Sequence, residues 1–300
     1  MKQGFRLQGA LTAIVTPFAA DGRVDLGALE RLAEWQVERG IHGLVPCGTT
    51  GEGATLTDEE QSEVIATVVR AAAGRVPVIA GCGSNDTRRT LAAARRAAEA
   101  GADGLLVVTP YYNKPNRSGM IAHFAAVASA TALPVVVYNV PGRTGQNLGV
   151  ELTLELARIP GVVGVKEASG DPGQVAAILA ARPPGFAVLS GDDALALPLV
   201  ALGAEGLIAV VSNEAPAETA ALIDAARRGE LERARLLHYR LLPLMQANFA
   251  ESNPVPVKTA LALLGRCRED VRPPLGPPAA ATRERVRAAL VAAGILGAEA

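Results

Sequence analysis

Short apolar runs alternate along the chain with longer segments in which apolar residues recur every three or four positions. The short runs are rich in valine, isoleucine and leucine and predict buried strands, whereas the longer segments predict amphipathic helices. Eight strands are predicted, at residues 10–16, 43–47, 76–81, 104–109, 133–139, 162–166, 187–190 and 206–210. Strands that alternate with helices in this way are typical of repeated βα units and a parallel sheet.

Several junctions between the predicted elements share one design. The segments RGIHGLV (39–45), AGADGLLV (100–107) and LGAEGLIAV (202–210) each place a glycine at a helix end, two turn residues, and a second glycine where a strand begins. In another helix, Thr57 followed by Glu60 predicts a capping box at the start, and the end is predicted at Gly74. Repeated use of one connector indicates that one βα unit is repeated.

The number of units predicts the fold class. Eight βα units in about 225 residues favour an α/β fold of the closed (β/α)8 or TIM-barrel type, whose usual size is about 250 residues. A doubly wound open sheet is the alternative, but neither a G-x-G-x-x-G after the first strand nor a P-loop is found. After the last strand, helices are predicted near residues 230–248, 255–265 and 281–294. We therefore expect a barrel at residues 1–229 and a helical C-terminal region at residues 230–300.

Composition narrows the choice of partners. The formal net charge of −1 over 300 residues gives no basic surface for nucleic acid or an anionic membrane. Three scattered cysteines and three scattered histidines predict neither a metal site nor a disulfide framework, and Cys47 and Cys82 are expected to be buried packing residues. No signal peptide is predicted, and the apolar segment 194–211 is interrupted by Pro198 and Glu205, so it predicts a buried helix and strand rather than a membrane span. A cytoplasmic protein with a small-molecule partner is expected.

A lysine stands at the end of the sixth predicted strand, in the segment GVVGVKEASGD (161–171). The carboxyl ends of barrel strands face the active site. One explanation for Lys166 is structural: its ammonium group reaches solvent or pairs with a carboxylate such as that of Glu167. The other is chemical: in a low-dielectric site the pKa of a lysine falls, and the free amine can attack a ketone to form a Schiff base.

Polar residues at other strand ends favour the chemical explanation. They lie in CGTTGEG (47–53), TPYYNKP (109–115), YNVPGRTG (138–145) and SGDD (190–193). Tyr138 can transfer protons if a hydrogen bond links its phenol to another hydroxyl, for which Thr50 is the candidate. Backbone N–H groups in GTTG, with the hydroxyls of Thr49 and Thr50, can bind a carboxylate. Taken singly, each residue has a simpler explanation. Thr49 and Thr50 can cap the turn, Tyr138 can be a half-buried strand aromatic, and Arg143 can be a solvated loop charge.

Two other polar features are expected to be structural. Asp192 and Asp193 are expected to cap the following helix rather than take part in acid–base chemistry. Lys258, in PVPVK (254–258), is expected to cap a loop or open a helix.

Taken together and in order, six motifs resemble the 4-hydroxy-tetrahydrodipicolinate synthase (dihydrodipicolinate synthase) family, from about residue 5 to the C-terminus: GTTGE, VTPYYNKP, YNVPGRTG, GVKEASGD, SGDDA and NPVPVK. The resemblance implies a class I aldolase-type barrel that condenses pyruvate with L-aspartate 4-semialdehyde in lysine and diaminopimelate biosynthesis. It also implies a homotetramer built as a dimer of dimers, with no cofactor other than the covalent Schiff base with substrate pyruvate.

The resemblance assigns catalytic roles to four residues. Lys166 matches the Schiff-base lysine of the family. Tyr138, Thr50 and Tyr112 match its proton relay, in which the residue at the position of Tyr112 reaches across a tight dimer interface.

The resemblance also assigns substrate-binding roles. Thr49 and Thr50 match the residues that hold the carboxylate of pyruvate, and Arg143 matches the arginine that binds the carboxylate of the semialdehyde. Gly191 and Ile208 match positions that contribute backbone groups to the site.

The chain departs from the family at the site where many members bind the inhibitor lysine. Asn85 and Tyr111 are retained, but Asp58, Gln61 and Arg89 stand where the lysine-sensitive pattern has histidine and glutamate. Arg89 would repel the ammonium group of the ligand. Weak or absent inhibition by lysine is therefore expected.

Three other functions stay open at this point. The first is another pyruvate-dependent aldolase, such as N-acetylneuraminate lyase or a 2-keto-3-deoxy-sugar-acid aldolase; Tyr112 and Arg143 favour the synthase over these. The second is a non-catalytic sensor of pyruvate or an amino acid, which the complete set of site side chains opposes. The third is a pyridoxal-phosphate enzyme that uses Lys166, for which no convincing phosphate-binding loop is found. The physiological aldehyde is not determined by these motifs.

Overall fold

The computed structural model describes residues 6–297, and in this range it contains one sheet of eight parallel strands. The strands are β1 (Gly9–Thr12), β2 (Gly43–Leu44), β3 (Ile79–Gly81), β4 (Gly104–Val108), β5 (Val135–Asn139), β6 (Val162–Glu167), β7 (Ala187–Ser190) and β8 (Gly206–Ala209). Their order is β2-β1-β8-β7-β6-β5-β4-β3, and an isolated parallel bridge between Leu44 and Val78 joins the two end strands. The sheet therefore closes on itself, and the predicted (β/α)8 barrel is confirmed, with each of the eight strands overlapping its predicted range.

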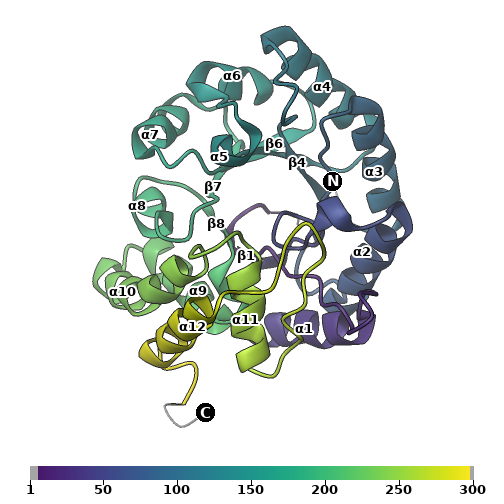
Figure 1. Ribbon diagram of the computed structural model, residues 1–300. Helices are drawn as coiled ribbons and strands as arrows, with labels where there is room; N and C mark the ends of the chain where they lie inside the picture. The colour runs from purple at the N-terminus through teal and green to yellow at the C-terminus, as the bar shows by residue number, and fades with distance from the viewer. Residues whose placement is uncertain (1–5, 298–300) are drawn as a thin grey trace.

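Helices surround the barrel and form the outer ring seen in Figure 1. The helices that follow the strands are α1 (Leu26–Glu38), α2 (Asp58–Ala72), α3 (Thr87–Glu99), α4 (Arg117–Ala130), α5 (Pro141–Thr144), α6 (Gly149–Leu156), α7 (Pro172–Ala181), α8 (Ala196–Ala201) and α9 (Pro216–Arg227), with two short 3-10 helices, η1 (Gly53–Thr55) and η2 (Val211–Asn213). The capping box predicted at α2 is confirmed, since the N–H of Glu60 donates to the Thr57 hydroxyl and the N–H of Thr57 donates to the Glu60 carboxylate.

The repeated glycine connectors are confirmed. Gly40, Gly101 and Gly203 have φ angles of +84°, +91° and +109°, a left-handed conformation that favours glycine. The second glycine of each connector is the first residue of β2, β4 or β8. At β8 the need for glycine is also steric, because a Cβ atom on Gly206 would lie 2.0 Å from the carbonyl oxygen of Gly9 in β1.

The side chains of the strands divide the apolar core into two layers. One cluster fills the inside of the barrel and includes Leu11, Ile79, Leu106, Val136 and Leu189. A larger cluster lies between the strands and the helices. The barrel is therefore a packed core rather than a pore, and only its rim is free to hold a site.

An irregularity between β5 and β6 determines which way Lys166 faces. Val135 pairs with Val162, but Val136 pairs with Gly164, so Val163 is an extra residue on β6. Because side chains alternate along a strand, one extra residue exchanges the two faces for the remainder of the strand. As a result Lys166 lies opposite Tyr138, whose side chain belongs to the interior cluster.

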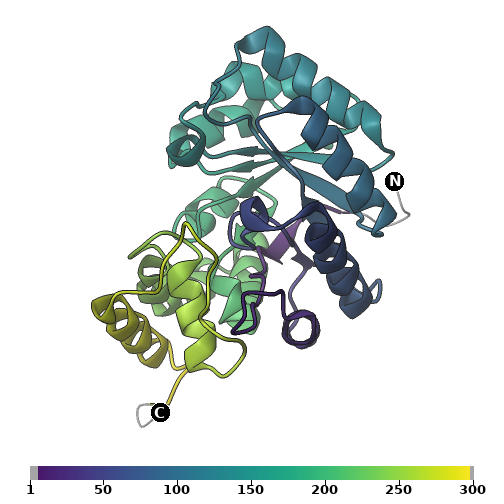
Figure 2. The same ribbon diagram turned by 45° about the vertical axis from the view of Figure 1, so that its right-hand side comes forward.

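Three further helices follow the barrel: α10 (Leu231–Ala247), α11 (Val255–Leu263) and α12 (Ala280–Ala292). They are the helices predicted from the sequence, and Figure 2 shows α11 and α12 packed at one side of the barrel. Their apolar side chains, including Leu244, Val257 and Val286, belong to the same core cluster as those of the barrel helices. The division of the chain near residue 230 remains a prediction.

The segment 194–211 folds as predicted, into the short helix α8 and the strand β8. Between residues 6 and 297, none of the helices combines the length and the apolar character that a bilayer crossing requires.

Candidate active site

Lys166 is buried near the carboxyl end of β6, with 6% of its surface exposed. Its Nζ atom lies 4.3 Å from the centroid of the Tyr138 ring. Within residues 6–297, no hydrogen bond or ion pair joins Nζ to another residue. Lysine is almost never buried without a charged partner, so this amine is in an unusual position for a structural residue.

Glu167 is not the partner of Lys166. Neighbouring residues on a strand point to opposite faces, and the Glu167 carboxylate instead accepts hydrogen bonds from Asn139 Nδ2 at 2.9 Å, the N–H of Ser169 at 2.7 Å and Gln174 Nε2 at 3.2 Å. The structural explanation in which Lys166 pairs with Glu167 is therefore wrong.

Gly191, after β7, leaves space for the lysine side chain. A Cβ atom at this position would lie 3.1 Å from both Cγ and Cε of Lys166, and 2.8 Å from Cβ of Ala168. These distances are shorter than ordinary van der Waals contact, so a larger residue at position 191 would displace the lysine.

The expectation that Asp192 and Asp193 cap a helix is wrong. α8 begins at Ala196 with no side-chain cap, because a turn separates it from β7. The carboxylate of Asp193 instead accepts hydrogen bonds from the N–H groups of Val210 at 3.1 Å and Val211 at 2.7 Å, just beyond β8. Burial raises the pKa of Asp193 to about 6, although these N–H groups and the charge of Lys166 favour its ionised form.

Tyr138 and Ile208 lie in the interior cluster, near the lysine end of the barrel. Thr49 and Thr50 lie in the loop after β2, where Thr50 is buried and Thr49 half-buried. The Thr50 hydroxyl accepts a hydrogen bond from Asn253 Nδ2 at 2.9 Å. The described residues include no hydrogen bond between Thr50 and Tyr138, so the predicted link is not formed in this structure.

Tyr112 and Arg143 do not meet the other candidates within one chain. The side chain of Tyr112 is 88% exposed, in the loop between β4 and α4, and its φ angle is +70°. Arg143 lies near the end of the short helix α5 and is exposed. Both residues are therefore available to a molecule or a chain that approaches the rim from outside.

Sequence reasoning missed a buried ion pair beside the loop that carries Thr50. Lys258 is fully buried in α11, and its Nζ donates to Glu52 Oε1 at 2.5 Å and to the carbonyl of Asp270 at 2.8 Å. It also lies 4.0 Å from the centroid of the Phe18 ring. Burial lowers the pKa of Lys258, while the neighbouring Glu52 carboxylate acts in the opposite direction.

α11 does open within PVPVK, and Lys258 is its fourth residue and donates to a loop carbonyl, but the ion pair between Lys258 and Glu52 was not expected. The signal in the sequence was the apolar context: Lys258 is the one charged residue in PVPVKTALALL (254–264). A lysine that is buried in such a run needs an acidic partner. Glu52, between two glycines of GTTGEG, is a candidate for that partner.

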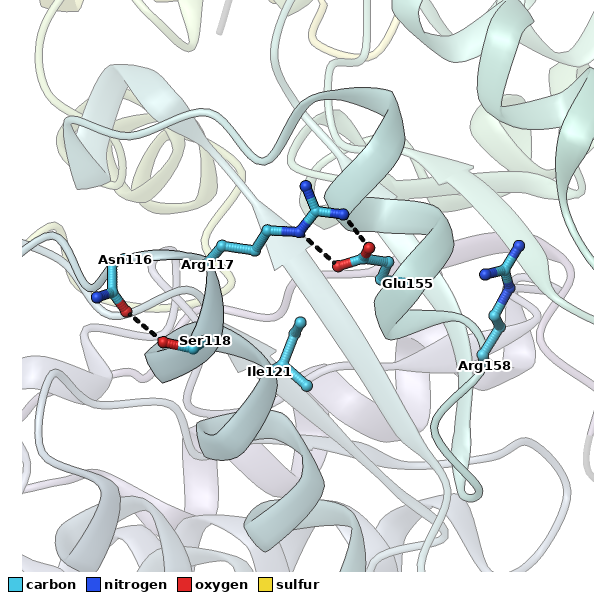
Figure 3. A pocket seen from close by; sticks show the side chains of 6 residues that line it. All are labelled: Asn116, Arg117, Ser118, Ile121, Glu155 and Arg158. Carbon is cyan, nitrogen blue, oxygen red and sulfur yellow. Dashed lines mark hydrogen bonds and ion pairs between the residues drawn. The ribbon is translucent and has the colours of Figure 1, made fainter.

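A groove of about 610 Å³ lies outside the barrel, between α4 and α6 (Figure 3). Its lining consists of Asn116, Arg117, Ser118, Ile121, Glu155 and Arg158. The guanidinium of Arg117 is already held by the carboxylate of Glu155. None of the candidate residues from the strand ends lines this groove, so the site is assigned to the barrel rim.

Two expectations concern cysteine and metal ions. Cys47 and Cys82 are buried, as predicted, and burial raises the pKa of Cys82 to about 12, so its thiol is unreactive. In the part of the chain from residue 6 to residue 297, no three histidine, cysteine or acidic side chains are grouped so that they could hold a metal ion.

A closed (β/α)8 barrel in which a buried lysine near the end of the sixth strand has no ion pair with any described residue is suited to the Schiff-base chemistry of class I aldolases. The chain matches the model of the Dihydrodipicolinate synthetase family over residues 6–293 and belongs to this family. The resemblance seen in the six motifs is confirmed.

Relatives with known names agree over nearly the whole chain. The sequence is 52% identical over 289 residues to the 4-hydroxy-tetrahydrodipicolinate synthase of Nitratidesulfovibrio vulgaris (strain DP4), covering 96% of this chain and 99% of the relative. It is 50% identical over 290 residues to the enzyme of the same name from Maridesulfovibrio salexigens, with coverages of 96% and 99%. Among solved structures, the dihydrodipicolinate synthase of Acinetobacter baumannii in complex with pyruvate has a TM-score of 0.95 and 44% identity, covering 97% of this chain and all of that one.

Proposed function

We propose that this chain condenses pyruvate with L-aspartate 4-semialdehyde to give 4-hydroxy-tetrahydrodipicolinate, in lysine and diaminopimelate biosynthesis, and that Lys166 forms the Schiff base. The observation that carries the proposal is the buried amine of Lys166 beside the ring of Tyr138, with no ion pair to any described residue. The names of the relatives support the overall reaction. The pyruvate complex of the Acinetobacter baumannii enzyme supports the first substrate.

In the proposed first half-reaction, the neutral amine of Lys166 attacks the carbonyl carbon of pyruvate. The new C–N bond forms, the carbonyl oxygen takes up protons and leaves as water, and the iminium that results withdraws electrons from the methyl group. Loss of a methyl proton then gives an enamine. No cofactor is needed, because the protonated imine is itself the electron sink.

In the second half-reaction, the enamine carbon attacks the aldehyde carbon of the semialdehyde. The new C–C bond forms and the aldehyde oxygen takes up a proton. The amino group of the bound product then attacks the imine carbon, which closes the ring and releases the amine of Lys166. Tyr138, Thr50 and the partner's Tyr112 are proposed to move the protons, and Arg143 to bind the semialdehyde carboxylate.

The proposal includes a homotetramer built as a dimer of dimers. Tyr111 and Tyr112 are exposed in the loop between β4 and α4, and Tyr112 is proposed to enter the site of a second copy. A second set of exposed apolar side chains, Leu202 after α8 and Leu236 and Tyr239 on α10, supports a second contact. A cytoplasmic location is also proposed, since buried free cysteines suit a reducing compartment.

The direct test is to incubate the protein with pyruvate, reduce it with borohydride and map the modified peptide by mass spectrometry. The chain has four lysines, so the peptide map is simple. We expect a stable pyruvyl adduct on Lys166 and none on the exposed Lys114, which is the internal control. A folded protein that forms no adduct would contradict the Schiff-base mechanism and favour a binding protein.

Turnover assays distinguish the synthase from the related aldolases. We expect activity with L-aspartate 4-semialdehyde and pyruvate, and none with N-acetylneuraminate or 2-keto-3-deoxy-sugar acids. Activity with a sugar acid and none with the semialdehyde, together with an adduct on Lys166, would support the Schiff-base mechanism but contradict the proposed substrate.

Inhibition by lysine is expected to be weak. Asp58 is already paired with Arg96 at 2.5 Å, and Arg89 on the neighbouring helix is exposed and positively charged. Both features oppose the binding of a second ammonium group. The initial rate should change less than about twofold at millimolar lysine, an effect within 0.5 kcal/mol, whereas Arg89→Glu should increase the sensitivity. Strong inhibition of the unmodified enzyme would show that the site tolerates these replacements.

A further inference from the structure

The C-terminal region touches one of the proposed relay residues directly. Asn253 lies between α10 and α11, and its side chain is buried, with 6% of the residue exposed. Its Nδ2 donates to Thr50 Oγ1 at 2.9 Å. Its Oδ1 is also buried, and no described residue donates to it. Burial of an amide is costly, and among residues 6–297 the only polar contact of this side chain is the one to Thr50.

The position of Asn253 is fixed relative to the loop that carries Thr50. Two residues after Thr50, the carboxylate of Glu52 accepts hydrogen bonds from Lys258 Nζ at 2.5 Å and from the N–H of Arg272 at 2.9 Å. Lys258 and Asn253 are five residues apart in the same C-terminal region. The bond from Asn253 to Thr50 is therefore one of a group of buried contacts that hold these two segments together.

The direction of this hydrogen bond determines what the Thr50 hydroxyl can do next. A threonine hydroxyl has one proton to donate and lone pairs that accept. Asn253 donates to the oxygen, so it uses a lone pair and leaves the proton free. No described residue accepts a hydrogen bond from Thr50. The proton is thus available to a relay partner or to a bound substrate.

We propose that Asn253 is a positioning residue for the reaction: by donating to Thr50, it directs the hydroxyl proton of Thr50 into the relay rather than toward the C-terminal region. The inference rests on the proposed role of Thr50. It assigns to the C-terminal region a part in proton transfer, in addition to packing against the barrel.

A double-mutant cycle tests the proposal in the full-length protein. Asn253→Ala should lower kcat about tenfold, a part of the roughly 10²–10⁴-fold that general acid–base catalysis contributes. The KM for the semialdehyde should stay within about twofold, because Arg143 is untouched. In the Thr50→Val background, Asn253→Ala should lower kcat no further, since coupled residues are not additive. Additive losses, or no loss in the single variant, would overturn the proposal.

The variant Asn253→Asp tests the polarity of the bond and keeps the shape of the side chain. A carboxylate accepts from Thr50 and turns its proton away from the relay, so kcat should fall at least as far as in Asn253→Ala. Burial raises the pKa of a carboxyl group, and a protonated aspartic acid can donate again. The ratio of kcat between this variant and the unmodified enzyme should therefore rise as the pH is lowered. Full activity of Asn253→Asp at all pH values would show that Asn253 accepts from Thr50, contrary to the proposal.

Failure of this inference can be told apart from failure of the proposed function. The unmodified protein is first tested for the borohydride-trapped adduct and for turnover of the semialdehyde. If both are present and Asn253 variants behave like the unmodified enzyme, the proposed function is retained and the role of Asn253 is rejected.

Discussion

Replacing Lys166 by arginine is expected to abolish condensation, with a loss in kcat of about 10³-fold or more, as is typical when a covalent nucleophile is removed. Arginine keeps the positive charge and most of the length of lysine, but its guanidinium is not deprotonated in proteins and cannot form a Schiff base. The measurement combines initial rates with borohydride trapping of pyruvate. Turnover and the trapped pyruvyl adduct should both be lost in this variant.

The variant Lys166→Met is the matched control for charge. Methionine removes the ammonium group but fills similar space, so it should be as inactive as Lys166→Arg and should fold, because Lys166 has no ion pair to lose within the described residues. If one of these variants retained turnover while losing the adduct, the amine would be dispensable and the Schiff-base mechanism would be wrong.

The second large effect is expected on stability, at the ion pair between Lys258 and Glu52. Both side chains are almost completely buried, with exposed fractions of 0% and 1%. Removal of one member of a buried pair leaves the other charge without compensation, which costs about 3–5 kcal/mol. Lys258→Met should therefore lower the free energy of unfolding by about this amount and the Tm by roughly 6–10 °C, as measured by chemical and thermal unfolding.

Two controls separate this effect from a general loss of charge. Arg283→Met removes one member of the half-exposed pair with Glu269 in the same region, and an exposed pair of this kind contributes at most about 1 kcal/mol. The double variant Lys258→Met with Glu52→Gln should be more stable than Lys258→Met alone, because no unpaired charge remains. A double variant as unstable as the single one would mean that packing of the lysine chain, rather than its charge, is what matters.

Much of the fold was predictable from local patterns. Each strand is a short apolar run, and the glycine connectors mark where helices end and strands begin. These patterns were enough to predict eight βα units and therefore a (β/α)8 barrel. The extra residue Val163 was not predictable, because the register depends on how two distant strands pair. An uninterrupted pairing would have placed Lys166 opposite Asn139, whose side chain contacts Glu167 rather than the barrel interior.

The candidate site was predictable where it depends on strand ends, and not where it depends on long-range contacts. The strand-end rule correctly indicated the burial of Lys166 and Tyr138 near one another. Asp193 was predicted to cap the nearest helix because that helix follows it in the sequence. Its carboxylate instead accepts hydrogen bonds from the N–H groups after β8, which the local sequence does not indicate. Asn253 and Lys258 touch Thr50 and Glu52 across more than 200 residues of chain, and no local pattern reports such a pairing.

The contacts between Glu52 and the C-terminal region have a consequence for the order of events during synthesis. Residues 49–53 leave the ribosome early, but their partners Asn253, Lys258 and Arg272 follow 203, 206 and 220 residues after the residues they bind. At a synthesis rate of about 5–20 residues per second, these partners are added of the order of ten seconds or more after the loop. Nascent chains that already contain Lys166 thus lack the contacts that hold Thr50 in place, and these contacts can form only after residues 253–272 have been translated.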